Sequence, residues 1–284
     1  VLDSFGVGAM LDAKKVRPRD VGSNTALHIL ETDKNYIWPT LEKLGLVNLL
    51  PCNEINGMKE NPFANTGKAN LTHFGADSFA GHQEIMGTKN KQPLLMPIQE
   101  VNTEIEKVLV EAGYQVAHIE KEGLVNLLVD DAVLIADNME TDLGQVMNVS
   151  GTLDKVTFED ITKIGKIVRE VVKVARVIAL GGRNVEVQQI IDAIYTKNGY
   201  MGLDTPKSGL YNEDYHVVHL GYGVDETVQV PKALEKNGIA TIFAGKVGDI
   251  VFNPSGRNFP GVDSDELFDM FIKQIKSEDN GFFC

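Results

Sequence analysis

Apolar and polar positions follow helical or strand-like spacing over most of the chain. The first residues form an apolar step before Asp3, which is typical of the end of a buried strand. Short helices are predicted at 26–30 and 38–46, the second of them ended by Gly45. Residues 53–75 are polar and show neither period, so they predict a loop.

Helical and strand patterns then alternate to the end of the chain. The predicted helices lie at 99–112, 157–174, 185–195, 225–237 and 264–276, and the predicted strands at 114–119, 132–136, 175–180 and 239–244. Residues 198–212 are rich in Gly, Pro, Ser and Asp and predict a connection. Alternation of this kind indicates an α/β fold.

Composition narrows the class of protein. A length of 284 residues suggests about two compact units, and 43% hydrophobic with 24% charged residues is ordinary globular composition. Lys and Arg number 27 against 40 Asp and Glu, a net charge of −13 that disfavours nucleic-acid or anionic-membrane binding and suits a divalent-metal enzyme. Cys52 and Cys284 have no disulfide or metal spacing, which favours a reduced cytoplasm.

Asp3 is the first candidate for chemistry, because it closes the first predicted strand. In open α/β sheets, ligands bind at the carboxyl ends of the strands, and an aspartate placed there is suited to a metal ion. The alternative is that Asp3 caps the turn that follows, a common use of aspartate.

The segment 77–84 holds the densest group of reactive side chains. A helix that begins near Ser78 would place backbone N–H groups beside a phosphate, and the Ser78 hydroxyl would be a nucleophile. The alternative is a helix cap formed by Asp77 or Ser78, with His82 and Glu84 solvated. The local sequence leaves both interpretations open.

Two basic residues lie at the ends of predicted strands, Lys246 after one strand and Arg176 at the start of another. Lys246 follows a buried strand and would bind a substrate phosphate, or else remain solvated, and Arg176 is a second anion-binding candidate. His216 and His219 would lie on opposite faces of a strand, which argues against a shared metal ion.

Four segments together resemble the phosphopentomutases of the alkaline phosphatase superfamily. They are the opening Val-Leu-Asp-Ser-Phe-Gly-Val-Gly (1–8), Asp-Val-Gly-Ser-Asn-Thr (20–25), Asp-Ser-Phe-Ala-Gly-His-Gln-Glu-Ile-Met-Gly (77–87) and Gly-Lys-Val-Gly-Asp-Ile (245–250). The Gly-His-x-Glu-Ile-Met-Gly stretch is the most specific of these.

The resemblance implies a doubly wound, alkaline phosphatase-like α/β core with an inserted smaller α/β cap. It implies core segments at 1–93 and 212–284 and a cap at 94–211. It also implies two divalent metal ions, Mn²⁺ first with Zn²⁺ or Mg²⁺ as alternatives, and Asp3 and Ser78 among their ligands. Ser78 stands where the family has its phosphorylated threonine, and Arg176, Ile178 and Lys246 match positions near the sugar phosphate.

The sequence also departs from the family pattern. Ala76 replaces a lysine, and the segment 140–142 differs from the one that meets the pentose. The remaining metal ligands of the family, from Asp-x₄-His, Asp-His-Gly and a further His, do not occur in this sequence. The sequence is therefore either a piece of a longer protein or a protein that has lost catalysis. We expect a piece, with a segment missing at each end.

The resemblance predicts a mutase that moves a phosphate on a small sugar phosphate through a phosphoserine at Ser78. Two alternatives remain open: a phosphate, phosphonate or sulfate ester hydrolase of the same superfamily, and a non-catalytic small-molecule binding protein. The expected partner is a small phosphorylated metabolite, with no nucleic acid and no membrane. The sequence does not indicate an oligomeric state.

Overall fold

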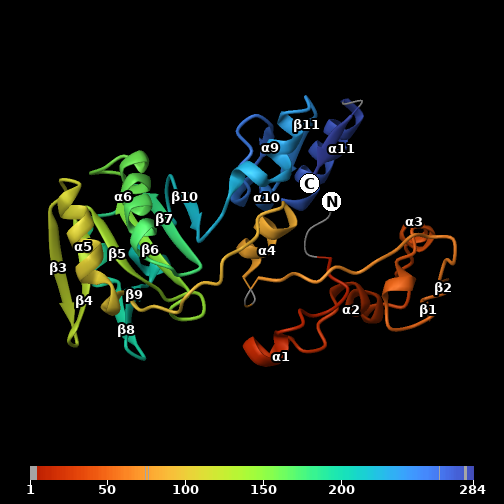
Figure 1. Cartoon of the computed structure of the whole chain (residues 1–284), viewed down its shortest axis with the longest axis horizontal. Helices are drawn as coiled ribbons and strands as arrows, with labels where there is room; N and C mark the ends of the chain where they lie inside the picture. Colours follow the sequence, from red (N-terminus) through yellow and green to blue (C-terminus); the bar gives the residue numbers. More distant parts are fainter. Residues whose placement is uncertain (1–4, 74, 76, 262, 278–279) are drawn as a thin grey trace. The chain divides into compact units, whose positions relative to one another are not determined.

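The computed structural model of the chain describes residues 5–73, 75, 77–261, 263–277 and 280–284. They form two compact units, coloured along the sequence in Figure 1. Unit 1 combines Val1–Gly87 with Thr227–Cys284, and unit 2 is Thr88–Glu226. Helices and strands occur in both units, so the predicted α/β class is confirmed.

Unit 2 is built on a mixed sheet of eight strands. Its main path runs β10-β7-β6-β5-β4-β3, while β9 pairs with β5 and β8 pairs with β9. The pairs β6–β7 and β5–β9 are parallel and the others are antiparallel. The strands are β3 Val116–Lys121, β4 Leu124–Val129, β5 Val133–Asn138, β6 Val146–Thr152, β7 Arg176–Gly182, β8 Ile194–Lys197, β9 Tyr200–Leu203 and β10 His216–Gly221.

Apolar clusters cover both faces of the central strands of this sheet. Successive side chains of a strand point to opposite sides, so one strand contributes to both clusters. On β5, Val133 and Ile135 join one apolar cluster with residues of α5 (Asn102–Glu111) and α6 (Phe158–Val171). Leu134 and Ala136 join a second cluster on the other face, which includes Ile190 of α7 (Val187–Asp192). Figure 1 shows α5 and α6 lying over the first face. The remaining helical segments of unit 2 are η3 Ile98–Glu100 and α8 Thr205–Ser208.

The helix α6 begins where the sequence predicts it. The Thr157 side chain accepts a hydrogen bond from the backbone N–H of Asp160, and the Asp160 carboxylate accepts one from the N–H of Thr157. This reciprocal capping box satisfies two helix-end donors.

The end of the predicted helix 185–195 is wrong, and so is the prediction of 198–212 as a plain connection. The helix stops at Asp192, Tyr195 lies in β8, and the connection contains β9 and α8. Pairing of β9 with β5 is a long-range contact, and it overrides the local turn-forming composition.

Unit 1 contains a three-stranded parallel sheet in the order β12-β11-β13. Its strands are β11 Ala240–Ala244, β12 Arg257–Phe259 and β13 Gly281–Phe283, and the nearby helical segments are α4 Ser78–Ile85, η4 Glu226–Val228, α9 Val230–Glu235, α10 Lys246–Ile250 and α11 Ser264–Ser277. The N-terminal part of unit 1 contains α1 Ala13–Val16, η1 Pro18–Asp20, α2 Thr25–Thr32, α3 Pro39–Lys43, η2 Val47–Leu49, β1 Glu54–Ile55 and β2 Met58–Lys59. None of the helices in the described part of the chain combines the length and apolar character of a membrane span.

The chain leaves unit 1 and returns to it at neighbouring points. In unit 2, the Thr88 hydroxyl donates to the backbone oxygen of Asp225 at 3.3 Å. In unit 1, the N–H of Val230 donates to the backbone oxygen of Met86 at 2.8 Å. The segment 94–211, expected as a cap, lies within unit 2; its limits and its role as a cap stay a prediction.

Asp137 is a buried carboxylate at the end of β5. Its two oxygens accept hydrogen bonds from the N–H groups of Ile98, at 2.8 Å, and Met201, at 3.1 Å. Burial raises the pKa of Asp137 to about 6, although these two hydrogen bonds act to lower it. Asp137 thereby connects η3 to the sheet and adds a side-chain contact between the neighbouring strands β5 and β9.

We predict that Asp137→Asn changes how the free energy of unfolding depends on pH. The folded pKa lies above the unfolded value of about 4, so the ionised folded state is disfavoured and stability falls as pH rises from about 4 to about 6. Asparagine does not ionise. Urea denaturation of both proteins across this range should show the wild type losing stability relative to the variant, on the order of 2 kcal/mol. A difference that stays constant with pH would contradict the prediction.

Candidate functional site

Ser78 is the first residue of α4, and its side chain is exposed. The helix begins here because the preceding Asp77 is an N-cap: its carboxylate accepts a hydrogen bond from the N–H of Phe79 at 2.9 Å. The predicted helix start is therefore confirmed, and so is the cap. A hydroxyl at this position lies at the positive end of an eight-residue helix.

Lys246 is the first residue of α10 and follows β11 through Gly245. Gly245 has φ +64°, a left-handed conformation that glycine adopts without strain. The Lys246 ammonium donates a hydrogen bond to the Ser78 hydroxyl at 3.3 Å, across 168 positions of sequence. The structure thus brings together two of the predicted site residues.

Arg176 and Ile178 both lie in β7 of unit 2. Arg176 pairs with Val146 of β6 on one side and with Gly221 of β10 on the other. Ile178 is 9% exposed and belongs to an apolar cluster. The two residues share one face of the strand, since they are two positions apart.

Asp3, the predicted metal ligand, lies outside the described residues. Within the residues that the structure describes, no three His, Cys, Asp or Glu side chains gather as a metal site would require. A divalent ion takes several oxygen or nitrogen ligands, and the described residues do not by themselves bring such a set together.

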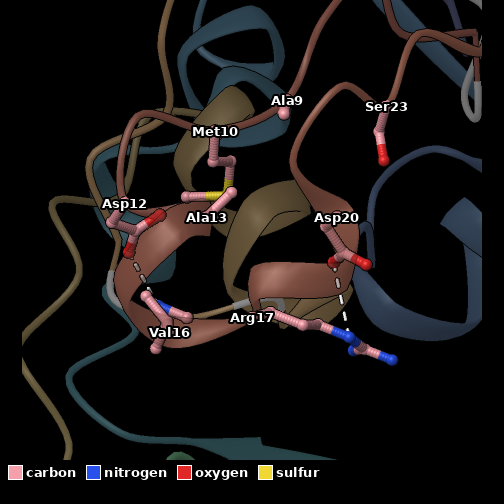
Figure 2. A pocket seen from close by; sticks show the side chains of 9 residues that line it. Ala9, Met10, Asp12, Ala13, Val16, Arg17, Asp20 and Ser23 are labelled. Carbon is pink, nitrogen blue, oxygen red and sulfur yellow. Dashed lines mark hydrogen bonds and ion pairs between the residues drawn. The ribbon is translucent and has the colours of Figure 1, made fainter.

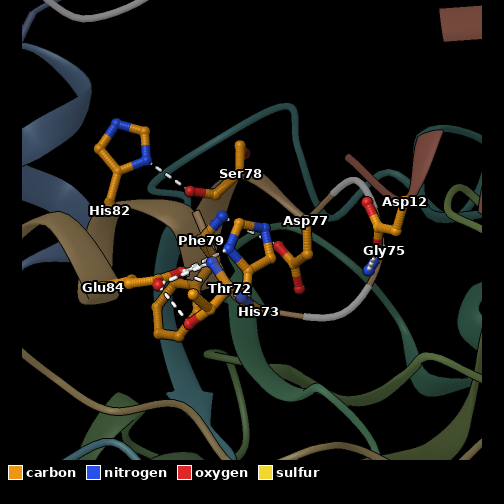
Figure 3. A network of polar contacts seen from close by, with 9 residues as sticks. All are labelled: Asp12, Thr72, His73, Gly75, Asp77, Ser78, Phe79, His82 and Glu84. Carbon is orange, nitrogen blue, oxygen red and sulfur yellow. Dashed lines mark hydrogen bonds and ion pairs between the residues drawn. The ribbon is translucent and has the colours of Figure 1, made fainter. Parts of the chain in front are cut away.

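Glu84 fastens the loop that leads into α4 (Figure 3). Its carboxylate accepts hydrogen bonds from the N–H of Thr72 at 2.7 and 2.9 Å, the Thr72 hydroxyl at 2.6 Å and the N–H of His73 at 3.0 Å. The His73 ring lies 3.0 Å away through Nδ1. Burial alone would raise the pKa of Glu84, but these hydrogen bonds outweigh it and lower the pKa to about 2.

The expectation that His82 and Glu84 are solvated in a simple helix cap is wrong. His82 is 8% exposed and its Nδ1 contacts the backbone oxygen of Ser78, while Glu84 anchors the loop. The sequence does not predict Thr72 and His73 as partners of Glu84, because the loop before α4 shows neither helical nor strand periodicity.

A small cavity of about 190 Å³ lies in the N-terminal part of unit 1 (Figure 2). Arg17 and Asp20 form an ion pair of 3.3 Å in its wall. Asp12 also lines it and accepts a hydrogen bond from the N–H of Gly75 at 3.3 Å. Asp12 therefore holds the segment just before Asp77. Asp12 precedes this segment in the sequence, whereas Glu84 follows it.

Comparison with known proteins gives one consistent result. A curated phosphopentomutase of Clostridium beijerinckii is 27% identical to this chain over 265 residues, which cover 88% of this chain and 60% of that protein. A phosphopentomutase of Clostridium tetani is 38% identical over 93 residues, or 33% of this chain and 23% of that protein. A phosphopentomutase of Agathobacter rectalis is 28% identical over 191 residues, which cover 59% of this chain and 47% of that protein.

The chain thus spans 60% or less of the length of these relatives. No family model matches it. The similarity at modest identity supports a divergent phosphopentomutase-like sequence.

We predict that Glu84→Gln destabilises unit 1 and removes a pH dependence. The folded pKa of Glu84 lies below its unfolded value of about 4.3, so its stabilising effect is complete above that value and is lost as pH falls toward about 2. At neutral pH the variant should lose about 1 kcal/mol in the free energy of unfolding.

Chemical denaturation at pH 7, 5 and about 3 tests this, with Glu31→Gln, an exposed carboxylate on α2, as the control. The stability gap between wild type and Glu84→Gln should narrow with acid, whereas the control should follow the wild type. An equal response of the two variants would contradict the anchoring role.

Proposed function

We propose that this phosphopentomutase-like chain carries the phosphoryl-transfer site of a mutase acting on a small sugar phosphate. The observation that carries the proposal is the hydrogen bond of 3.3 Å between Lys246 and the Ser78 hydroxyl. It joins, at one point, two sequence motifs that resemble the family's nucleophile and phosphate-binding segments. The similarity to phosphopentomutases supports the same reaction class.

Ser78 would carry the phosphoryl group as a phosphoserine. Its oxygen forms the bond to phosphorus while the bond to a sugar oxygen breaks, and the reverse step delivers the group to another hydroxyl of the sugar. The proton released by the accepting hydroxyl is balanced by the one that Ser78 regains, so the isomerisation consumes no water. The start of α4 and the Lys246 ammonium both favour the anionic phosphoryl group there.

Lys246 is suited to this role because an ammonium group is a compact charge on a flexible stem. Its side chain is exposed, as is that of Ser78, so a phosphate has access to both. An ionic hydrogen bond to a phosphoryl oxygen is stronger than one to a neutral hydroxyl. The contact between the two side chains supports the proposal that a phosphate binds there.

We propose Arg176 and Ile178 on β7 as substrate-binding residues near the sugar phosphate, and the segment 94–211, which lies within unit 2, as the cap that excludes water. Both assignments rest on the resemblance to the family. A water-excluding cap would favour transfer over hydrolysis.

We also propose dependence on two divalent metal ions, Mn²⁺ before Zn²⁺ or Mg²⁺, with Asp3 and Ser78 among the ligands. The described residues provide no group of three ligands, so no step above is made to depend on an ion. Elemental analysis of the longer protein that this sequence is expected to belong to, after dialysis against Mn²⁺, tests this, because the family's remaining ligands do not occur in this sequence. A metal content indistinguishable from that of buffer would count against it.

The proposed partner is a small phosphorylated metabolite, and the proposed location is the cytoplasm. The net charge of −13 supports the absence of nucleic-acid and anionic-membrane partners, because both carry the same sign of charge.

We predict that incubation with Mn²⁺ and a pentose bisphosphate places one phosphoryl group on Ser78. Ser78→Ala should abolish the label and the interconversion of pentose phosphates, whereas Ser78→Thr should retain both, because threonine keeps the hydroxyl. Peptide mass spectrometry locates the phosphoryl group. Ser277→Ala, an exposed serine at the end of α11 in the same unit, is the control and should be labelled like the wild type.

Release of inorganic phosphate without isomerisation would favour the hydrolase alternative. Saturable binding of a sugar phosphate with neither labelling nor turnover would favour a binding protein. Labelling of Ser78→Ala at the wild-type rate would exclude Ser78 as the acceptor.

A further inference from the structure

Two buried glutamines form a hydrogen-bonded pair, and one of them connects the helices that carry Ser78 and Lys246. Gln83 of α4 is 2% exposed and Gln229, at the N-cap of α9, is 1% exposed. The Gln229 amide donates from Nε2 to Oε1 of Gln83 at 2.6 Å. Gln83 in turn donates from Nε2 to the backbone oxygen of Ile250, also at 2.6 Å. We refer to Gln83 and Gln229 as the amide pair.

The amide pair connects α4 to the far end of α10. Ser78 begins α4 and Gln83 lies five positions later, while Lys246 begins α10 and Ile250 ends it. The hydrogen bond between Gln83 and Ile250 therefore fixes the distance between two short helices whose first residues meet at the Ser78 hydroxyl.

The orientation of the amide pair is determined by its partners. A backbone oxygen only accepts hydrogen bonds, so the Gln83 amide must direct its NH₂ group to Ile250 and its oxygen to Gln229. Gln229 must then present its own NH₂ group. A glutamate at position 83 would offer only acceptors when ionised and would be unable to replace this arrangement.

Burial of both side chains makes the amide pair hard to replace by water. The apolar cluster of this part of unit 1 includes Met86, Phe243, Val247 and Val251, which come from α4, β11 and α10 or directly follow them. A buried amide in such surroundings stays in place because it loses its partners when it moves.

We propose that Gln83 is the positioning residue of the site, and that it holds α4 against α10 so that the Lys246 ammonium reaches the oxygen of Ser78. Gln229 fixes the orientation of the Gln83 amide. The consequence for phosphoryl transfer rests on the function proposed above. The positioning of Lys246 beside residue 78 by Gln83 is independent of that function, because it concerns only the distance between an ammonium group and the side chain at position 78.

The test reads this approach with a thiol in place of the hydroxyl. In Ser78→Cys, an ammonium group close to the sulfur favours the thiolate and lowers the thiol pKa below its usual value of about 8.5. The rate of alkylation by iodoacetamide as a function of pH gives that pKa, and peptide mass spectrometry separates position 78 from Cys52 and Cys284. Adding Lys246→Met shows the value without the ammonium, with α4 still present.

Adding Gln83→Met to Ser78→Cys should raise the thiol pKa to the value seen with Lys246→Met. We expect a change of about one pKa unit, equivalent to roughly tenfold less thiolate at neutral pH. Methionine has a similar length and shape but forms neither amide hydrogen bond. Gln83→Glu should fail to restore the lower pKa, and Gln229→Met, which keeps the bond from Gln83 to Ile250, should raise it partway.

The control for general destabilisation is Leu30→Ala, a fully buried residue of α2 in a separate apolar cluster of unit 1. It should lower the melting temperature and leave the thiol pKa of Ser78→Cys unchanged. If Gln83→Met does not fold, the partial shift with Gln229→Met decides the matter, and no shift there overturns the proposal.

A thiol pKa that responds to Lys246→Met but not to Gln83→Met overturns the positioning role. A thiol pKa that responds to neither shows that the contact between positions 78 and 246 does not form, which overturns it as well. A pKa that depends on Gln83, combined with no phosphorylation of Ser78 in the wild type, supports the positioning role and rejects the proposed function.

Discussion

The hydrogen bond between Lys246 and Ser78 is the interaction on which the candidate site depends, and it requires the chain to return after a long excursion. Closing a flexible loop of that length costs conformational entropy. Unit 2 reduces the problem because it folds as a compact body whose ends are joined through Thr88 and Asp225. Within unit 1, the hydrogen bond from the N–H of Val230 to the backbone oxygen of Met86 joins the two segments of the chain that flank unit 2.

The helix α4 is held from both directions along the chain. Ahead of it, Glu84 and Asp12 fix the backbone of the incoming loop through N–H groups. Behind it, the Gln83 amide reaches α10. An exposed serine is thus set on a helix that hydrogen bonds hold at several points. The proposed phosphoryl transfer needs such an arrangement, because it requires Ser78 and a phosphate to meet in one geometry.

Features with local signals were predictable from the sequence, and features made by distant partners were not. The capping box of α6 and the cap of α4 depend on residues within three positions of each other, so their types and spacing suffice. The strand β9 and the bond from Gln229 to Gln83 depend on partners far along the chain. Ser78 and Lys246 were named from motifs, but only the fold shows their contact, and the role of Asp3 stays a prediction.

The discontinuity of unit 1 has a consequence for biosynthesis. The helix bearing Ser78 leaves the ribosome well before the segment that supplies Lys246, with all of unit 2 translated in between. Domains emerge and fold in order from the N-terminus. The contact between Ser78 and Lys246 therefore forms only when the second part of unit 1 docks onto the first.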